Sequence, residues 1–142
     1  SWKTDGSETA TSLISGAAMA DVIAIDVTSD GIFLLTSEAV SRLLKYTLAG
    51  VYVSTTSLDY EDYSQGLFGQ PYWSAVGLTK YLFVSDRLNN RVMVYDKDGA
   101  YSHQFGSYGS GNGEFESAAG IAVSADYVYV AESSGSRRVQ IF

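Results

Sequence analysis

Cysteine is absent from this 142-residue sequence, and histidine and positive charge are scarce. Without cysteine the chain can form no disulfide framework and no thiolate metal site. The single histidine, His103, cannot by itself supply the imidazole cluster that a metal-dependent lyase or hydrolase needs. The sequence contains no apolar run of about eighteen residues and no basic segment followed by an apolar one, so we expect neither membrane insertion nor a signal peptide.

Acidic residues outnumber basic ones by sixteen to nine, which gives a net charge of -7. The five arginines and four lysines are scattered, with Arg137 and Arg138 as the only adjacent pair. Phosphate backbones require clustered positive charge, so nucleic acid is not an expected partner. Hydrophobic residues make up 46% and charged residues 18% of the chain, a composition typical of a globular protein.

The composition leaves the location of the protein open. It suits a cytosolic protein and equally a surface protein that uses no disulfides, and of the two we favour an extracellular or cell-surface location. The chain begins at Ser1 rather than Met, so removal of a leader and excision from a longer protein are both open.

A repeat runs through most of the chain. Three copies align on Arg42, Arg91 and Arg138, at spacings of 49 and 47 residues. Each copy breaks into short stretches of β-branched and aromatic residues separated by turn residues, which indicates strands and not helices. In the second copy the four expected strands cover about residues 75–78, 81–85, 91–95 and 100–105.

Four-stranded repeats of this length without helices predict an all-β fold, a β-propeller. The three expected blades cover about residues 21–56, 74–105 and 119–142. The motifs "GNGEFESAAGIAV" from Gly111, "YVYVAESSGSRRVQIF" from Tyr127 and "YLFVSDRLNNRVMVY" from Tyr81 closely resemble the blades of the NHL-repeat family. The first copy resembles them more weakly.

The arginine shared by the three copies is the clearest scaffold residue. The NHL resemblance implies that Arg91 pairs with Asp86 and Arg138 with Glu132, while Ser37 stands where the first copy would have the acid opposite Arg42. Residues that obey the repeat are expected to fix the blade and not to bind a ligand.

Other suggestive residues have simpler explanations. "DKDG", residues 96–99, resembles a calcium loop, but the first copy has "TLAG" at this place, so a hairpin turn is expected. The glycine-rich stretch 106–115 lacks the Gly-Lys-Ser/Thr of a phosphate loop and is expected to connect two blades. His103 falls on an outer strand, where a solvated histidine is expected. No cofactor is expected.

The loops between blades and the turns between second and third strands should open on one face of the propeller. The long loop from Ser57 to Trp73 is rich in aromatic residues. Exposed aromatic rings with polar neighbours suit recognition of a protein or a sugar. The candidate ligand-binding residues are Tyr63, Tyr72, Trp73, Arg87, Asn89, Asn90, Tyr108, Ser134 and Arg137. Packing between blades is an equal alternative for each ring.

These features favour a non-catalytic module that binds a protein, peptide or glycan. Two alternatives come from propellers that resemble this one: an enzyme of the lyase, lactonase or hydrolase kind with a metal in its channel, and an RNA-binding domain, which the acidic composition disfavours. A fragment of a longer propeller is a further alternative.

Three blades are fewer than the four to eight, roughly, with which propellers close. The third copy ends at Phe142 on its third strand, which leaves an unpaired edge. Residues 1–20, with "ETATSLISG" from Glu8 to Gly16, are expected to supply an outer strand to a blade. We therefore predict a two-fold homodimer in which each N-terminal strand completes the partner's last blade and six blades close the ring.

Overall fold

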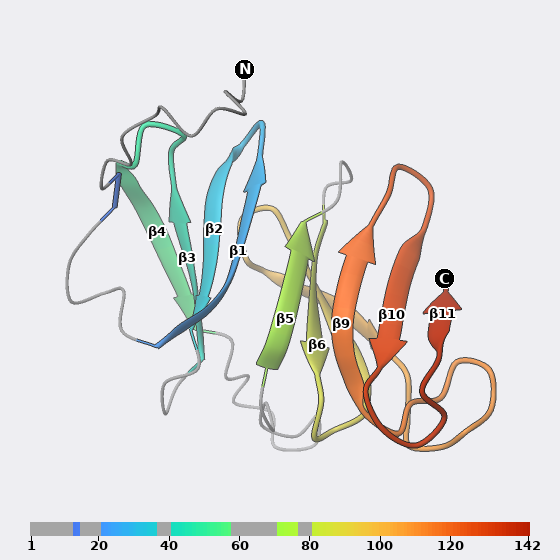
Figure 1. The fold of residues 1–142 in the computed structure, drawn as a ribbon. Coiled ribbons are helices and arrows are strands. Elements are labelled where there is room, and N and C mark those ends of the chain that lie inside the picture. The colour runs from blue at the N-terminus through green and yellow to red at the C-terminus, as the bar shows by residue number, and fades with distance from the viewer. Residues whose placement is uncertain (1–12, 15–20, 37–40, 58–70, 77–80) are drawn as a thin grey trace, which may run out of the picture.

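The described part of the chain is built only of β-strands. The computed structural model describes residues 13–14, 21–36, 41–57, 71–76 and 81–142, and for residues 71–76 only the backbone. These residues form eleven strands in three antiparallel sheets (Figure 1). Within these ranges, no helix is long and apolar enough to cross a membrane. The predicted all-β fold is confirmed.

The sheets follow one another along the chain, and each is one blade. Blade 1 contains β1 (Val22–Thr28), β2 (Gly31–Thr36), β3 (Arg42–Tyr46) and β4 (Tyr52–Ser57). Blade 2 contains β5 (Pro71–Val76), β6 (Tyr81–Asp86), β7 (Arg91–Asp96) and β8 (Tyr101–Phe105). Blade 3 contains β9 (Ala118–Val123), β10 (Val128–Glu132) and β11 (Val139–Ile141). In each blade the strands pair in sequence order, as in a meander.

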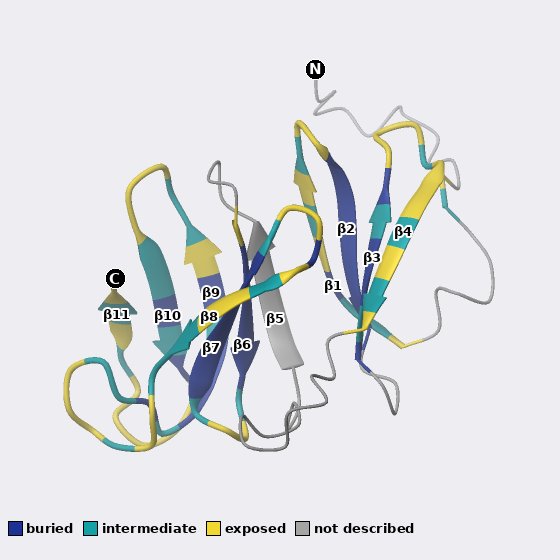
Figure 2. Cartoon of the chain, turned by 180° about the vertical axis from the view of Figure 1, so that it is seen from behind, coloured by how far each residue is buried: buried dark blue, intermediate teal, exposed yellow. Residues whose placement is uncertain are grey.

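The middle strands of blades 1 and 2 are their most buried strands, as expected where packing covers both faces of a sheet. Every residue of β2 is buried, as are the last five residues of β6 and the first five of β7. Figure 2 shows the contrast with the outer strands: four of the six residues of β4 and two of the five residues of β8 are exposed, and the others are partly buried. The near-continuous apolar runs in the sequence therefore correspond to two-sided burial.

Two of the three buried clusters in the described residues lie between blades. We call the side of a blade that faces the preceding blade its front face, and the side that faces the following blade its back face. Side chains on the back face of blade 1 meet the front face of blade 2 in one cluster, whose buried members are Ala24, Phe33, Leu35, Leu43, Leu82, Val84, Met93 and Tyr95. Each fully buried side chain of this size contributes about 1.5–3 kcal/mol.

A second cluster joins blades 2 and 3 in the same way. Its buried members are Phe83, Val92, Val94, Phe115, Ala118, Ile121 and Val130. Phe115 comes from the connection between β8 and β9, and its ring lies 6.5 Å from that of Phe105 and 5.7 Å from that of Phe142. This connection is therefore part of the packing between blades.

One predicted boundary differs from the structure, and another lies mostly outside the described residues. β5 begins at Pro71, four residues before the expected start, so Tyr72 and Trp73 belong to the innermost strand of blade 2 and not to a loop. Tyrosine and tryptophan favour strands, and proline is tolerated as the first residue of one. Of the predicted N-terminal strand, only Leu13 and Ile14 are described, and they lie in a bend.

Candidate functional site

The turns of blades 2 and 3 and the connection between these blades lie at the same edge of the molecule, the lower one in Figure 1. This edge is formed by the β6–β7 turn (residues 87–90), the β10–β11 turn (133–138) and the β8–β9 connection (106–117). We call it the turn face. Six of the nine predicted ligand-binding residues lie on it: Arg87, Asn89, Asn90, Tyr108, Ser134 and Arg137.

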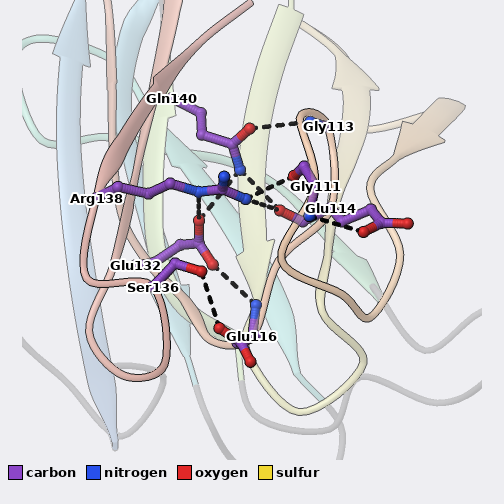
Figure 3. Close-up of polar contacts among 8 residues, drawn as sticks. All are labelled: Gly111, Gly113, Glu114, Glu116, Glu132, Ser136, Arg138 and Gln140. Atoms are coloured by element: carbon purple, nitrogen blue, oxygen red, sulfur yellow. Dashed lines mark hydrogen bonds and ion pairs between the residues drawn. The ribbon is translucent and has the colours of Figure 1, made fainter.

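In blade 3 the turn face is held by one buried carboxylate, that of Glu132 at the end of β10. Its Oε1 accepts hydrogen bonds from Arg138 Nε (2.6 Å) and Gln140 Nε2 (3.1 Å), and its Oε2 accepts one from the backbone N–H of Glu116 (2.8 Å). Figure 3 shows these side chains converging on the connection that leads into β9. The carboxylate therefore joins the strands of blade 3 to the loop before it.

Arg138 and Gln140 extend the contact along the glycine-rich loop. Arg138 Nη2 donates to the carbonyl oxygens of Gly111 (2.6 Å) and Glu114 (3.1 Å). The amide of Gln140 donates to Glu114 O (2.7 Å) and accepts from the N–H of Gly113 (2.9 Å) (Figure 3). Residues 111–116 are thus held by polar side chains from β10, from the β10–β11 turn and from β11.

The pKa of Glu132 is lowered from its ordinary value of 4.5. Burial acts in the opposite direction, since it disfavours the charged form, but the hydrogen bonds from Glu116 N–H and from Arg138, together with the charge of Arg138, outweigh it. The Glu132 side chain has no exposed surface, whereas 27% of that of Arg138 is exposed. Glu132 is therefore a permanently ionised acceptor at neutral pH.

Blade 2 repeats the arrangement with an aspartate. Arg91 Nε lies 3.0 Å from Asp86 Oδ2, and both side chains are almost completely buried. Asn89 Nδ2 donates to the same carboxylate oxygen (2.8 Å), and Arg91 Nη1 donates to Gln104 Oε1 on β8 (2.9 Å). The two predicted ion pairs, Asp86 with Arg91 and Glu132 with Arg138, are present in the structure.

Blade 1 departs from this pattern at the acidic position. Strand pairing puts Thr36, and not Ser37 as predicted, in the place of Asp86 and Glu132, because Leu35 pairs with Leu43. The hydroxyl of Thr36 accepts a hydrogen bond from the N–H of Arg42 (3.2 Å). A neutral hydroxyl thus caps this strand end where the other two blades use a carboxylate.

The turn face presents several side chains to solvent above this scaffold. Tyr108 is 74% exposed, and Ser134 and Arg137 are exposed as well. Arg87 is half-buried because its Nε donates to Ser117 Oγ (2.9 Å), which in turn lies 3.0 Å from Ser133 Oγ. Arg87 thus bridges blade 2 and the entrance to blade 3.

Asn90 and Arg137 share an unusual backbone conformation. Both have positive φ angles, 53° and 46°, and each immediately precedes the arginine of an ion pair. Asparagine tolerates this left-handed region, whereas arginine rarely adopts it. The turn geometry is therefore repeated in both blades, although only one of them has a residue suited to it.

The side chains of the remaining three predicted residues lie outside the described part of the structure. Tyr63 lies outside the described residues. Tyr72 and Trp73 lie on β5, where Trp73 pairs with Ser85 across the strands, but their side chains are outside the described part. A ligand-binding role for these rings stays a prediction.

Sequence reasoning missed the residues that connect the scaffold to the loop. Gln140, Ser117 and Glu116 take part in the networks above, and Ser136 Oγ donates to Glu116 Oε2 (2.9 Å) (Figure 3). A usable signal was present for Gln140, which lies two residues after Arg138 and hence on the same face of the strand. Ser117 and Glu116 had no comparable signal, since their roles depend on contacts between segments distant in sequence.

The other candidate motifs form local structures. The Asp96 carboxylate accepts hydrogen bonds from the N–H groups of Asp98 and Ala100 (both 2.9 Å), and Gly99 has a φ of 89°, so this segment is a hairpin turn. His103 is exposed on β8, with its Nδ1 3.1 Å from Ser102 Oγ. Within the described ranges, no three His, Cys, Asp or Glu side chains lie close enough together to hold a metal ion.

Comparison with known proteins agrees with this architecture. Residues 74–138 match a family described as a 6-bladed β-propeller. A segment of 47 residues is 51% identical to part of the RING finger protein nhl-1 of Caenorhabditis elegans, covering 33% of this chain and only 5% of that protein. Together with the two four-stranded sheets and the three-stranded sheet, these matches confirm the resemblance seen in the motifs: the sheets are β-propeller blades, and their sequence is similar to NHL repeats.

Proposed function

We propose that the chain is a non-catalytic binding module that recognises a protein, peptide or glycan through its turn face. The observation that carries this proposal is the contrast between a rigid base and exposed tips. The base is the pair of buried networks around Asp86 and Glu132, and the tips include Tyr108 and Arg137. A preorganised surface loses little conformational entropy when a ligand binds.

The chemistry of the exposed side chains suits such ligands. The ring of Tyr108 offers a flat apolar surface with a hydroxyl, and Arg137 offers a cation with several donors. Arg87 contributes a second guanidinium, oriented by Ser117. Aromatic and arginine side chains often dominate the binding energy of protein interfaces, and aromatic rings also stack on sugars. In this proposal the working module is a homodimer of two such chains.

The test uses the chain itself against a glycan array and a displayed peptide library. We expect a ligand from one panel to lose at least tenfold in affinity when Tyr108→Ala and Arg137→Ala are combined, which corresponds to about 1.4 kcal/mol. Tyr127→Ala is the control, because Tyr127 is also exposed (53%) but lies in the β9–β10 turn at the opposite edge. Absence of binding in both panels, or equal losses for the two variants, would contradict the proposal.

A further inference from the structure

The back face of blade 3 has the pattern of a surface that packs against another blade. Strand pairing places Val139 and Ile141 at the positions that Val92 and Val94 occupy in blade 2, because Arg138 corresponds to Arg91. Val92 and Val94 are completely buried between blades 2 and 3. Val139 and Ile141, in contrast, are 62% and 61% exposed. The same positions are core in one blade and surface in the next (Figure 2).

The front face of blade 1 shows the complementary half of such a contact. Its buried cluster of Ile32, Leu34, Leu44 and Tyr46 corresponds position by position to Leu82, Val84, Met93 and Tyr95, the front face that blade 2 packs on blade 1. On the same side of the sheet, Ile25 and Val27 pair with Leu34 and Ile32 and remain 63% and 56% exposed. This face is therefore only partly covered within one chain.

The segment at Leu13 and Ile14 marks where a preceding blade would lie. A Cβ atom on Gly99, in the β7–β8 turn, would collide with Thr56 on β4, the outer strand of the preceding blade. A Cβ atom on the equivalent Gly50, in the β3–β4 turn, would collide with Leu13. Leu13 thus has the same position relative to blade 1 that Thr56, on an outer strand, has relative to blade 2.

Ile14 supports the same placement independently. Its side chain packs against the cluster on the front face of blade 1. That face is the one that blade 2 presents to blade 1, so a residue packed on it occupies the place of a preceding blade. Leu13 and Ile14 therefore lie where the outer part of a preceding blade would be. The described residues include no inner strands for such a blade.

We propose that these inner strands are β9, β10 and β11 of a second copy of this chain. The back face of one copy's blade 3 packs on the front face of the other's blade 1, and the segment at Leu13 and Ile14 adds the fourth strand beside β11. A two-fold axis repeats the contact, so that no matching surface is left open. Two copies of three blades give six, the number in the family that residues 74–138 match.

The edge of β11 is suited to this addition. Phe142 exchanges both backbone hydrogen bonds with Val128, and Glu132 N–H donates to Arg138 O. Since hydrogen-bonded pairs alternate along an antiparallel ladder, the N–H groups of Val139 and Ile141 point to the open edge. An added strand would pair with these groups while its side chains and those of β11 enter the contact between blades.

The first experiment measures the mass of the chain in solution by sedimentation. We expect twice the 15.3 kDa of one chain for the unchanged protein and for Leu88→Lys, and a single-chain mass for Val139→Lys combined with Ile141→Lys. Leu88 is a matched control, because it is 59% exposed but lies in the β6–β7 turn. A folded single-chain species for the unchanged protein overturns the proposal, as does a dimer that the double change leaves intact.

Hydrogen exchange locates the contact even if a variant folds poorly. In the unchanged protein the amide hydrogens of Val139 and Ile141 should exchange at least tenfold more slowly at high than at low protein concentration. Protection independent of concentration, or none, overturns pairing with a second copy and leaves a further blade of a longer chain as the occupant. This test needs no ligand, so its failure is distinguishable from failure of the binding function.

Discussion

Replacement of Glu132 by alanine removes the carboxylate that joins β10, β11 and the β8–β9 connection. Arg138 Nε, Gln140 Nε2 and the backbone N–H of Glu116 each lose a hydrogen bond to this carboxylate, and Gln140 Nε2 keeps its bond to Glu114 O. The side chain of Glu132 has no exposed surface, so water cannot replace it without local opening. We expect the loop to loosen and the chain to become less stable.

The magnitude follows from burial and from the remaining partners. Removal of one member of a buried ion pair costs about 3–5 kcal/mol, because the other charge is left uncompensated. Arg138 is 27% exposed and keeps its bonds to two carbonyl oxygens, so the lower limit of about 3 kcal/mol applies. Glu132→Gln keeps an acceptor for Arg138 and should cost about half as much.

Urea unfolding followed by circular dichroism measures the effect. With a slope of about 1–3 kcal/mol per molar urea, a loss of about 3 kcal/mol lowers the midpoint by about 1–3 M. Asp98→Ala is the control, since Asp98 forms an exposed ion pair with Lys97 and its removal should leave the midpoint unchanged. An unchanged midpoint for Glu132→Ala would refute the idea that this carboxylate holds the turn face together.

Three further predictions test the fold. Folding lowers the pKa of Glu132, so the stability that its ionised form contributes is fully present above pH 4.5 and is lost as the pH falls through the lower folded-state value. The free energies of unfolding of the wild type and Glu132→Gln should therefore converge in that acid range. Gly99→Ala should cost more free energy of unfolding than Gly113→Ala, since both glycines have positive φ but only Gly99 has a neighbour, Thr56, in the way of a methyl group. Phe115→Ala should cost about 3–5 kcal/mol in the same assay, because its ring is fully buried between blades 2 and 3.

The fold was predictable because its signals are local and repeated. Short strands with turn residues between them recur three times, so errors at one boundary, such as the start of β5, do not change the topology. The ion pairs were predictable for the same reason, since Arg91 and Arg138 recur at one register position. Repetition served as an internal control that a single motif would lack.

The contacts around the turn face were less predictable because they join distant segments. Gln140 bonds to Glu114 and Gly113 across more than twenty residues, and Arg87 bonds to Ser117 across thirty. No periodicity in the sequence reports such contacts. The prediction of Ser37 instead of Thr36 opposite Arg42 was wrong for a similar reason, because a one-residue shift in register is visible only once the strands are paired.

The conformation of Arg137 gives a prediction that links stability to function. Asn90 and Arg137 occupy the same left-handed position before the paired arginine, and the arginine is the less suited of the two. Arg137→Asn should therefore stabilise the chain by about 1 kcal/mol, and the reciprocal Asn90→Arg should destabilise it by a similar amount.

The same variant tests the binding role of Arg137. If the guanidinium contacts the ligand of the turn face, the stabilised variant should also lose affinity for that ligand. Urea midpoints and binding curves for both variants measure the two effects. A stabilised Arg137→Asn variant with unchanged binding would confirm the strain and show that the guanidinium is not used for binding. A variant without stabilisation would show that the turn carries no strain at this residue.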